Sequence, residues 1–406
     1  MSKPVCAIFI MPRESSAWTS AEGLWVTARG WAKAALPHYD KLYFVSRDKI
    51  TNLQGAQNYP VGSFKVEKST GGLKKLIPSF FKLLLKDLML WKRSREWSIL
   101  DNPPWGNEKV AYIWEQHDMF PGPGSKLANE LNAPLVSFVH APNIWEAEKW
   151  GVKRYLWGLW VQRYQEIKNL KKADRVACVS ESVRQKLVEL GLEADKVLVT
   201  PMSIDPDDFQ PEPNEVLRQE LGLPGKKVVG WIGTFRDFHG VDTIIFALKK
   251  LRTQFTNLAL LFVGEGQVFE ETKILVKEEG LSDYVVFTGR VANKEISRYI
   301  SLFDIALVSA RTSKNFHYSP HKLREYMAMG VASIAPDAGE IPNIFNEGEH
   351  IVLYKAGDIE SLSEAIASLL QDDTKRNKMA RYGKQFVLDT STWGVQFEKV
   401  IESLNA

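Results

Sequence analysis

The feature that most constrains the fold is an alternation of short apolar runs with helical patterns, which occurs twice along the chain. The runs are continuously apolar and rich in β-branched residues, which is typical of strands covered on both faces. The predicted strands are 5–11, 42–45, 110–114, 135–139, 176–179 and 197–199, then 228–232, 259–263, 285–287, 305–308, 332–335 and 351–354. The stretches between them, such as 241–255 and 361–370, can form crossover helices. This pattern predicts an α/β protein with two doubly wound, Rossmann-like parallel sheets.

A proline-rich segment at 201–224 separates the two sets of strands, and 406 residues are enough for two domains. We expect a first domain at 1–205, joined by a C-terminal helix at 390–406, and a second domain at 206–389. Ligands of open α/β sheets bind beyond the carboxyl ends of the strands. Two such domains that face each other would form a cleft with one ligand-binding rim on each wall.

Composition indicates a protein of the cell interior. Apolar residues make up 45% and charged residues 25% of the chain, which is ordinary for a globular protein. Cys6 and Cys178 both fall in apolar runs, so we expect reduced buried thiols, with no disulfide and no zinc. We identify no leader peptide and no apolar run of membrane-spanning length. The expected location is the cytoplasm.

Charge is distributed unevenly along the chain. Residues 1–200 contain 29 Lys and Arg against 20 Asp and Glu, a net +9, which leaves 23 against 29, a net −6, in the other 206 residues. A basic first half favours an anionic partner, either membrane headgroups or a phosphorylated acceptor, although a merely uneven surface explains it equally well. No known nucleic-acid-binding motif accompanies the charge, so nucleic acid is not an expected partner.

Two stretches, 73–97 and 145–172, combine many Lys and Arg residues with Trp, Tyr, Phe and Leu. Basic helices that are rich in aromatic residues suit the headgroup layer of an anionic membrane. Long helices that pack on the first domain with a solvated basic face give the same pattern. The sequence therefore leaves open a peripheral position on the inner face of the membrane.

The segment 319–330 carries the most chemical information. Ser319 suits the cap of a helix, Pro320 its first position and Gly330 its end. This predicted helix follows the strand 305–308, and free N–H groups at a helix start suit a diphosphate without any metal. Glu325 lies about one and a half turns into the helix, where a carboxylate can accept hydrogen bonds from sugar hydroxyls. A capped helix with a surface glutamate is the alternative.

The sequences KLREYMAMG at 322–330 and APDAGEIP at 335–342 resemble the donor motif of the retaining glycosyltransferases of family 4, which have the GT-B fold. The segments 173–183, 196–209, 263–266 and 287–291 are similar to other parts of that family, in the same order. The resemblance implies that a hexose is transferred with retention from a UDP- or GDP-sugar to a carbohydrate or lipid-linked acceptor. The basic aromatic stretches favour polysaccharide or glycolipid assembly, and we expect no metal and no cofactor besides the co-substrate.

The resemblance also assigns roles in the second domain. Glu325 matches the second Glu of the family's paired motif, which holds the donor ribose, while the first Glu falls on His317. The family's diphosphate-binding Arg and Lys fall on Thr234 and His239, and a protonated His239 would add charge. Arg236 is the expected main cation for the leaving group. Further donor contacts are expected from Ser319, His321, Lys322, Gly264, Arg290 and Val291, although Lys322 could instead point into solvent.

In the first domain, the resemblance places His140 beside the transferred sugar. Gly23 is all that remains of the family's glycine-rich loop under the donor phosphates. Arg13 in the same loop, and either His117 or Asp118 after the strand 110–114, are expected to bind the acceptor.

Two rival functions remain open at this stage. A nucleotide-sugar 2-epimerase has the same architecture and needs no acceptor. A sugar-nucleotide-binding subunit without activity would account for the departures at His317, Thr234 and His239. The Asp205-Pro206-Asp207 triplet spells the metal signature of another glycosyltransferase fold, but it falls in the interdomain segment and is interpreted as coincidence.

Overall fold

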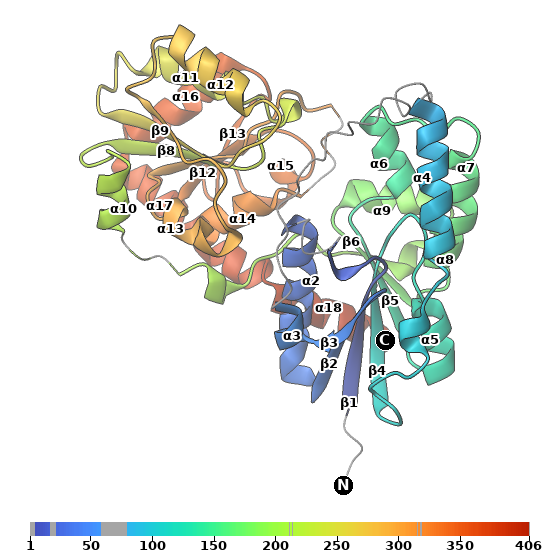
Figure 1. Cartoon of the computed structure of the whole chain (residues 1–406). Helices are drawn as coiled ribbons and strands as arrows, with labels where there is room; N and C mark the ends of the chain where they lie inside the picture. The colour runs from blue at the N-terminus through green and yellow to red at the C-terminus, as the bar shows by residue number, and fades with distance from the viewer. Residues whose placement is uncertain are drawn as a thin grey trace. The chain divides into compact units, whose positions relative to one another are not determined.

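The computed structural model describes residues 5–16, 22–57, 79–210, 212, 214–314, 316 and 319–405. Its contacts divide the chain into two units, one of residues 1–201 with 396–406 and one of residues 202–395. The boundaries expected from the sequence were 205/206 and 389/390. Each unit is built on one sheet, and the chain enters the second unit and then returns to the first (Figure 1).

The sheet of the first unit has the strand order β3-β2-β1-β4-β5-β6-β7. Every pairing is parallel except that of β3 with β2. The order reverses between β1 and β4, so polar residues that follow these strands lie at a switch point. The strands are β1 (Val5–Met11), β2 (Lys41–Ser46), β3 (Ile50–Asn52), β4 (Lys109–Gln116), β5 (Leu135–Val139), β6 (Arg175–Cys178) and β7 (Val197–Val199).

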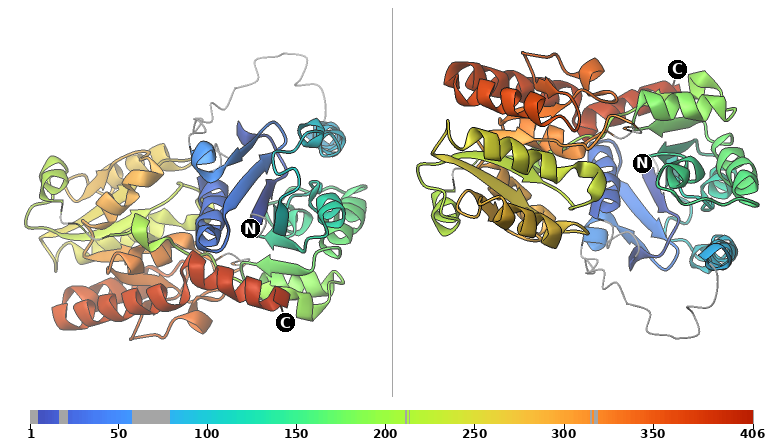
Figure 2. Two further views of the ribbon diagram at one scale, coloured as in Figure 1. Left: turned by 90° about the horizontal axis from the view of Figure 1, so that it is seen from below. Right: turned by 90° about the horizontal axis from the view of Figure 1, so that it is seen from above.

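Helices cover both faces of this sheet (Figure 2). They are α2 (Glu22–Ala35), α3 (Leu53–Gln57), α4 (Ser79–Arg93), α5 (Gly124–Leu131), α6 (Asn143–Lys149), α7 (Gly158–Val161), the π-helix η4 (Gln162–Ile167), α8 (Lys168–Leu170) and α9 (Glu181–Glu189), with short 3₁₀ turns η1 (Leu36–His38), η3 (Ser98–Leu100) and η5 (Ala194–Lys196). The final helix, α18 (Trp393–Asn405), packs here too. Its Phe397 and Val400 are fully buried, and Lys399 Nζ donates to Val199 O at 2.8 Å.

The sheet of the second unit is parallel throughout, in the order β10-β9-β8-β11-β12-β13. Its strands are β8 (Lys227–Ile232), β9 (Leu258–Val263), β10 (Val285–Phe287), β11 (Ile305–Leu307), β12 (Ala332–Pro336) and β13 (Val352–Tyr354). Its helices are η6 (Pro206–Asp208), α10 (Glu215–Glu220), η7 (Asp237–His239), α11 (Val241–Leu251), α12 (Phe269–Glu278), η8 (Asn293–Glu295), α13 (Ile296–Ile300), α14 (His321–Ala328), α15 (Ile341–Ile344), α16 (Ile359–Leu370) and α17 (Asp373–Thr390). The order reverses between β8 and β11.

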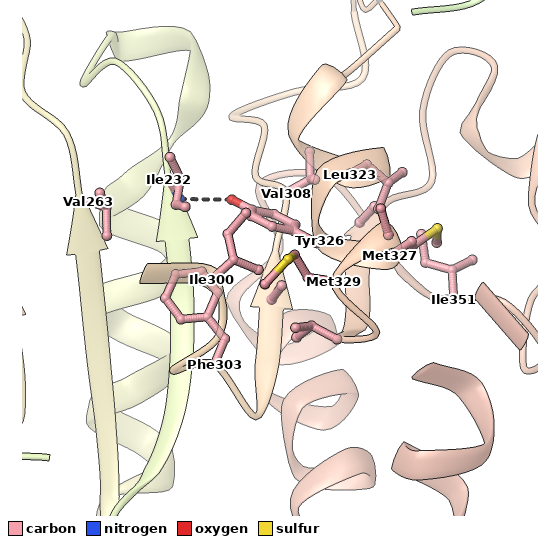
Figure 3. Close-up of a cluster of buried hydrophobic side chains, with 14 of the residues drawn as sticks. Ile232, Val263, Ile300, Phe303, Val308, Leu323, Tyr326, Met327, Met329 and Ile351 are labelled. Atoms are coloured by element: carbon pink, nitrogen blue, oxygen red, sulfur yellow. Dashed lines mark hydrogen bonds between the residues drawn. The ribbon is translucent and has the colours of Figure 1, made fainter. Parts of the chain in front are cut away.

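Two apolar layers explain why the strands of this unit are continuously apolar. In β9, Leu261 and Val263 belong to the cluster on one face of the sheet, while Leu260 and Phe262 belong to the cluster on the other. The first of these clusters packs α14 against the sheet, and Figure 3 shows Tyr326 of that helix reaching β8. Burial of both faces is what the alternation in the sequence predicts.

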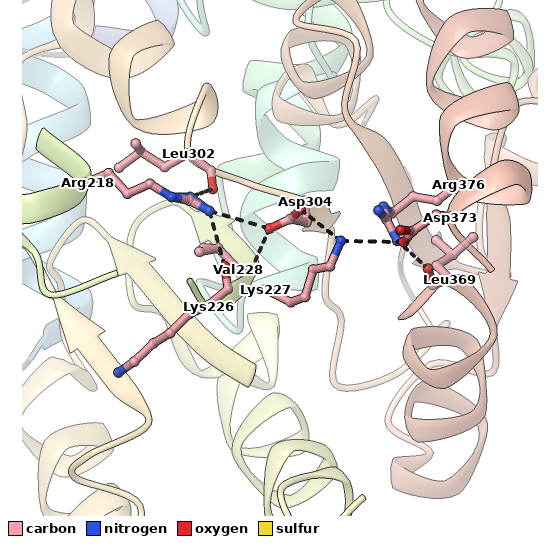
Figure 4. Close-up of polar contacts among 9 residues, drawn as sticks. All are labelled: Arg218, Lys226, Lys227, Val228, Leu302, Asp304, Leu369, Asp373 and Arg376. Atoms are coloured by element: carbon pink, nitrogen blue, oxygen red, sulfur yellow. Dashed lines mark hydrogen bonds and ion pairs between the residues drawn. The ribbon is translucent and has the colours of Figure 1, made fainter. Parts of the chain in front are cut away.

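Charged residues tie the second sheet together at its amino end. Asp304, just before β11, accepts a hydrogen bond from Val228 N at 2.8 Å and lies 3.8 Å from Arg218 and Lys227 (Figure 4). Since strands β8 and β11 begin at this end, their carboxyl ends, where ligands of such sheets bind, lie at the opposite edge.

The predicted fold class is confirmed. Each strand predicted from an apolar run is present, and the ends differ by two residues at most. Strand β3 was not predicted, because it has three residues and only Ile50 is apolar. It pairs antiparallel at the edge of the sheet, where a strand is not covered on both faces.

Candidate active site

Helix α14 begins beyond the carboxyl ends of β8 and β11, the two strands at the switch point of the second sheet. It does not begin as predicted. Pro320, not Ser319, occupies the cap position, and no side chain caps the helix. Ser319 Oγ instead accepts a hydrogen bond from Arg324 Nη1 at 2.8 Å, because that buried guanidinium needs an acceptor. The predicted helix end is confirmed, since Gly330 has φ +72°.

Glu325 is held in place by its own helix. Its Oε1 lies 2.9 Å from His321 Nδ1, one turn earlier, and its side chain is only 12% exposed. His321 Nε2 is buried and has no hydrogen-bond partner among the described residues. One turn of α14 therefore holds the Glu325 carboxylate against the His321 ring.

Lys322 points into the unit, contrary to the alternative that placed it in solvent. Its Nζ is buried, and no described residue accepts a hydrogen bond from it. The ammonium lies 4.4 Å from the centre of the Trp231 ring and next to Gly233, the residue that follows β8. Burial lowers the pKa of Lys322 to about 7, with Glu325 acting in the opposite direction. A cation so poorly compensated is a strong site for an anion.

The candidate residues in the loop after β8 differ in their exposure to solvent. Thr234 and Arg236 are exposed, whereas His239 is buried and its ring contacts Trp231 edge-on at 5.7 Å. Burial and the charge of Lys322 lower the pKa of His239 to about 2. Protonation of His239, which the sequence left open, is therefore disfavoured in this environment. The neutral ring can still donate or accept one hydrogen bond at each nitrogen.

The glycines after β9 are needed for a backbone contact. Gly264 has φ +127°, and a Cβ at this position would lie 2.0 Å from Gly233 O. A Cβ on Gly266 would lie 2.6 Å from Phe235 N. The loops that follow β8 and β9 therefore touch directly. Arg290, in the neighbouring loop, is exposed, while Val291 packs on the core.

Tyr326 fixes the position of α14 on β8. Its hydroxyl accepts a hydrogen bond of 2.8 Å from Ile232 N, and the side chain is fully buried. Tyr326→Phe would leave that N–H unpaired, so we expect a loss of about 1–3 kcal/mol in the free energy of unfolding, measured by urea denaturation of the second unit. The exposed Tyr382 is the control, and Tyr382→Phe should change stability by less than about 0.5 kcal/mol. An unchanged midpoint for Tyr326→Phe would contradict this role.

In the first unit, Arg13 and Asp118 are brought together. Arg13 Nη2 lies 2.6 Å from Asp118 Oδ1, and a second hydrogen bond runs from Nε to the other carboxylate oxygen. This pairing raises the pKa of Arg13. The two side chains line a hollow of about 190 Å³ with Arg47 and Arg93. A bidentate pair at the ends of β1 and β4 can exchange its partners for hydroxyl or phosphate groups of an acceptor.

His117 has a different environment from its neighbour Asp118. Its Nε2 lies 3.0 Å from Glu166 Oε1, and the two side chains are 4% and 0% exposed. Glu166 also accepts hydrogen bonds from the first two N–H groups of α6, Asn143 N at 2.6 Å and Ile144 N at 3.2 Å. Glu166 was not identified from the sequence. The sequence feature that could have identified it is that Glu166 is the lone acid in a long basic stretch. In the structure Glu166 lies in the π-helix η4, and such helices are often found at functional sites.

A second buried acid, Glu115, also escaped the sequence analysis. It is the last residue but one of β4, accepts a hydrogen bond from Gly124 N at 2.6 Å, and lies 3.3 Å from Asn169 Nδ2. Burial raises the pKa of Glu115. Glu115 and Glu166 are thus two buried carboxylates near the carboxyl end of β4.

The structure describes two of the three remaining candidate residues, His140 and Gly23. His140 directly follows β5, and its ring lies edge-on to Phe138 at 5.0 Å. Gly23 is the second residue of α2. His317 lies outside the described residues. In the interdomain segment, Asp205 caps the short helix η6 by accepting from Asp207 N at 3.1 Å, which gives the Asp-x-Asp triplet a local structural role.

The described residues include neither a metal-binding cluster nor a membrane-spanning helix. No three His, Cys, Asp or Glu side chains gather there as a metal site. No helix in that part of the chain is long and apolar enough to cross a membrane.

Two family models match the chain. The model "Glycosyl transferases group 1" matches residues 213–386, and "Glycosyltransferase Family 4" matches residues 110–208. The first match contains the loops after β8 and β9 and helix α14. The second contains β5, β6 and β7 of the first sheet and all of β4 but its first residue.

Curated relatives match at modest identity. A GDP-mannose-dependent alpha-(1-6)-phosphatidylinositol monomannoside mannosyltransferase of Mycobacterium tuberculosis is 26% identical over 236 residues, which are 57% of this chain and 61% of that protein. The N-acetyl-alpha-D-glucosaminyl L-malate synthase of Bacillus anthracis is 25% identical over 221 residues, 54% of this chain and 56% of that one. The matched region thus spans less than two thirds of these relatives.

Solved structures share the whole fold. Anabaena Alr3699/HepE, solved in complex with UDP, has a TM-score of 0.66 at 16% identity and covers 99% of both chains. Sucrose-phosphate synthase from Thermosynechococcus elongatus has a TM-score of 0.66 at 18% identity over 98% of both. These identities establish similarity of fold alone. The chain thus has the fold of these solved structures, and parts of it match two glycosyltransferase family models.

Proposed function

We propose that this protein transfers a hexose from a nucleotide diphosphate sugar to a carbohydrate or lipid-linked acceptor, with retention of anomeric configuration. The observation that carries the proposal is the buried Lys322 ammonium, which lies beside the end of β8 and has no acceptor among the described residues. A diphosphate would supply the missing negative charge. Retention follows from the resemblance to family 4.

The proposed donor site combines three kinds of contact. The amino end of α14 and Lys322 would bind the diphosphate and stabilise the charge that develops on it as the sugar leaves. Glu325 would accept hydrogen bonds from the ribose hydroxyls. Arg236, exposed on the loop after β8, would add a second cation. No metal and no other cofactor enters this proposal.

The nature of the donor is proposed from the relatives. HepE has been solved with UDP-glucose, and the mycobacterial relative is named as GDP-mannose-dependent. We therefore propose a UDP- or GDP-sugar. The acceptor side would be formed in the first unit by Arg13 and Asp118, with His140 close to the transferred sugar. We place the reaction in polysaccharide or glycolipid assembly, in the cytoplasm at the inner face of the membrane.

The test is a donor-binding titration with Glu325→Gln. We expect the variant to bind UDP-glucose or GDP-mannose, whichever the parent binds, about 10- to 100-fold more weakly, because an amide accepts hydrogen bonds less strongly than a carboxylate. Glu364→Gln, on the exposed face of α16, is the matched control and should bind like the parent. Equal donor affinity in Glu325→Gln would overturn the assignment.

The same preparation separates the rival functions. A transferase consumes the donor only when an acceptor is present, and NMR of the product reports whether the anomeric configuration is retained. Donor isomerised without any acceptor would indicate the 2-epimerase. Tight binding without turnover across a panel of acceptors would indicate a binding subunit.

A further inference from the structure

Two segments of the first unit expose large apolar side chains next to Lys and Arg. In α4, Phe81, Leu85, Leu88 and Met89 are 49–57% exposed. In the segment 150–164, Tyr155, Leu156 and Leu159 are 74–82% exposed, and Trp150, Trp160 and Tyr164 about half. Single exposed apolar residues are common in globular proteins, but so many in two segments indicate an interaction surface.

The arrangement of α4 is that of a helix lying in an interface. The exposed apolar residues are spaced i, i+4, i+7 and i+8, and therefore lie on one side of the helix. The exposed cations Lys82, Lys86 and Arg93 form the adjoining strip, and Lys92 lies among the apolar residues. The opposite side of the helix, which includes Asp87, faces the protein.

The two segments are fixed to each other. Arg154 Nε donates to Asp87 Oδ2 at 2.6 Å, and Trp157 Nε1 donates to the same oxygen at 2.7 Å. The rings of Trp91 and Trp160 meet edge to face at 6.3 Å. Figures 1 and 2 show α4 beside α7 at one side of the first sheet. We name these two segments, 79–95 and 150–172, the basic aromatic surface.

Charge on the basic aromatic surface has one sign. Its two acidic residues, Asp87 and Glu166, are both buried, so none of its exposed residues is an acid. Besides the α4 cations, it exposes Lys153, Arg163, Lys168, Lys171 and Lys172. A hollow of about 610 Å³ beside α7 is lined by Leu159, Tyr164, Ile167, three of these cations and the carboxylate of Glu189, which lies outside the two segments. Acids do occur nearby, as Glu146 and Glu148 of α6, but outside this surface.

We propose that the basic aromatic surface binds the headgroup layer of a bilayer that contains anionic phospholipid. Exposed Trp, Tyr and Leu side chains enter the boundary between headgroups and acyl chains, while Lys and Arg contact lipid phosphates. A protein partner with an acidic, apolar face is the competing occupant. The bilayer is favoured because lysines, in which protein interfaces are depleted, are interleaved with aromatic residues over two elements. The inference deepens the membrane location in the proposed function.

The experiment measures co-sedimentation of the full chain with vesicles, without donor or acceptor, so its outcome is independent of glycosyl transfer. One set of vesicles contains phosphatidylcholine alone, and the other contains equal parts phosphatidylcholine and phosphatidylglycerol. We expect binding to the second set only, weakening as salt rises. Leu156→Ser with Leu159→Ser should reduce the affinity about tenfold, and so should Lys82→Gln with Lys86→Gln and Lys92→Gln.

Matched controls come from the second unit. Val216→Ser with Ile274→Ser removes two exposed apolar side chains, and Lys277→Gln with Lys294→Gln and Lys355→Gln removes three exposed charges. These variants should bind vesicles like the parent. Equal binding to both sets of vesicles, or a parental affinity in both surface variants, would overturn the proposal. The proposal would also be overturned if light scattering showed the parent to be a dimer and the variant Leu156→Ser with Leu159→Ser to be a monomer, while both bound vesicles equally well.

Discussion

Lys322→Met is expected to bind the nucleotide sugar about 10- to 100-fold more weakly than the parent, because a hydrogen bond to a charged group contributes about 1.5–3 kcal/mol. The free protein should become more stable at the same time. The buried ammonium has no acceptor, so replacing it by a thioether removes a desolvation penalty on the order of 1–4 kcal/mol. Calorimetric titration and urea denaturation measure the two effects.

This opposite pair of effects distinguishes a ligand-binding lysine from a structural one. Lys277→Met, at an exposed position on α12, is the control and should change neither quantity. If Lys322 served the core, its removal would lower stability and leave affinity unchanged. That result would remove the observation on which the proposed function rests.

The pH dependence of stability and donor affinity in the parent follows from the titration of Lys322. Burial lowers the pKa of Lys322 from 10.5 to about 7, so the free folded protein binds fewer protons than the unfolded chain between these values. Stability therefore rises with pH across this window, and the penalty is complete below pH 7. Donor affinity has the opposite trend, since a diphosphate favours the ammonium: it should fall by up to about tenfold per pH unit above 7. In Lys322→Met both slopes should flatten.

Glu166→Ala is expected to destabilise the first unit by about 3–5 kcal/mol, because it removes the acceptor of two helix N–H groups and of His117 inside the protein. Eleven of the thirteen Trp residues lie in this unit, so Trp fluorescence during urea unfolding reports on it. Glu189→Ala, at an exposed carboxylate paired with Lys186, should cost less than about 1 kcal/mol.

A conservative replacement refines this second prediction. Glu166→Gln keeps one acceptor oxygen for the start of α6. Its free energy of unfolding should therefore lie between that of the parent and that of Glu166→Ala. Because His117 is held by the same carboxylate, acceptor KM should rise in Glu166→Gln if the edge at β4 binds the acceptor. A loss in Glu166→Ala no larger than in Glu189→Ala would show that the start of α6 is not capped in this way.

The architecture was predictable because burial on both sheet faces leaves a direct record in the sequence. Continuous apolar runs such as 259–263 are hard to explain otherwise, and each became a strand. The short edge strand β3 left no such record. Helix α14 was located correctly, but its cap was not, because the competing demand of Arg324 for Ser319 arises from a tertiary contact.

The candidate site was predictable in its location more than in its chemistry. The resemblance gave Glu325 and Lys322 as donor residues, yet it could not reveal that Lys322 is buried without an acceptor, since burial depends on the packing of α14 against β8. The burial that lowers the pKa of His239 also arises from packing, beside Trp231. Glu166 was not predicted, because its neighbours in the sequence are basic and polar and give no sign that its carboxylate is buried.

Helix α18 has a consequence for the order in which the protein is made. Phe397 lies against His38 and Tyr112, so part of the first unit's apolar interior is covered only by a segment translated after the second unit. During synthesis on the ribosome, residues 202–395 can therefore complete their structure while the earlier sheet still exposes the surface that α18 will cover. The unit encoded first is the one that finishes folding last.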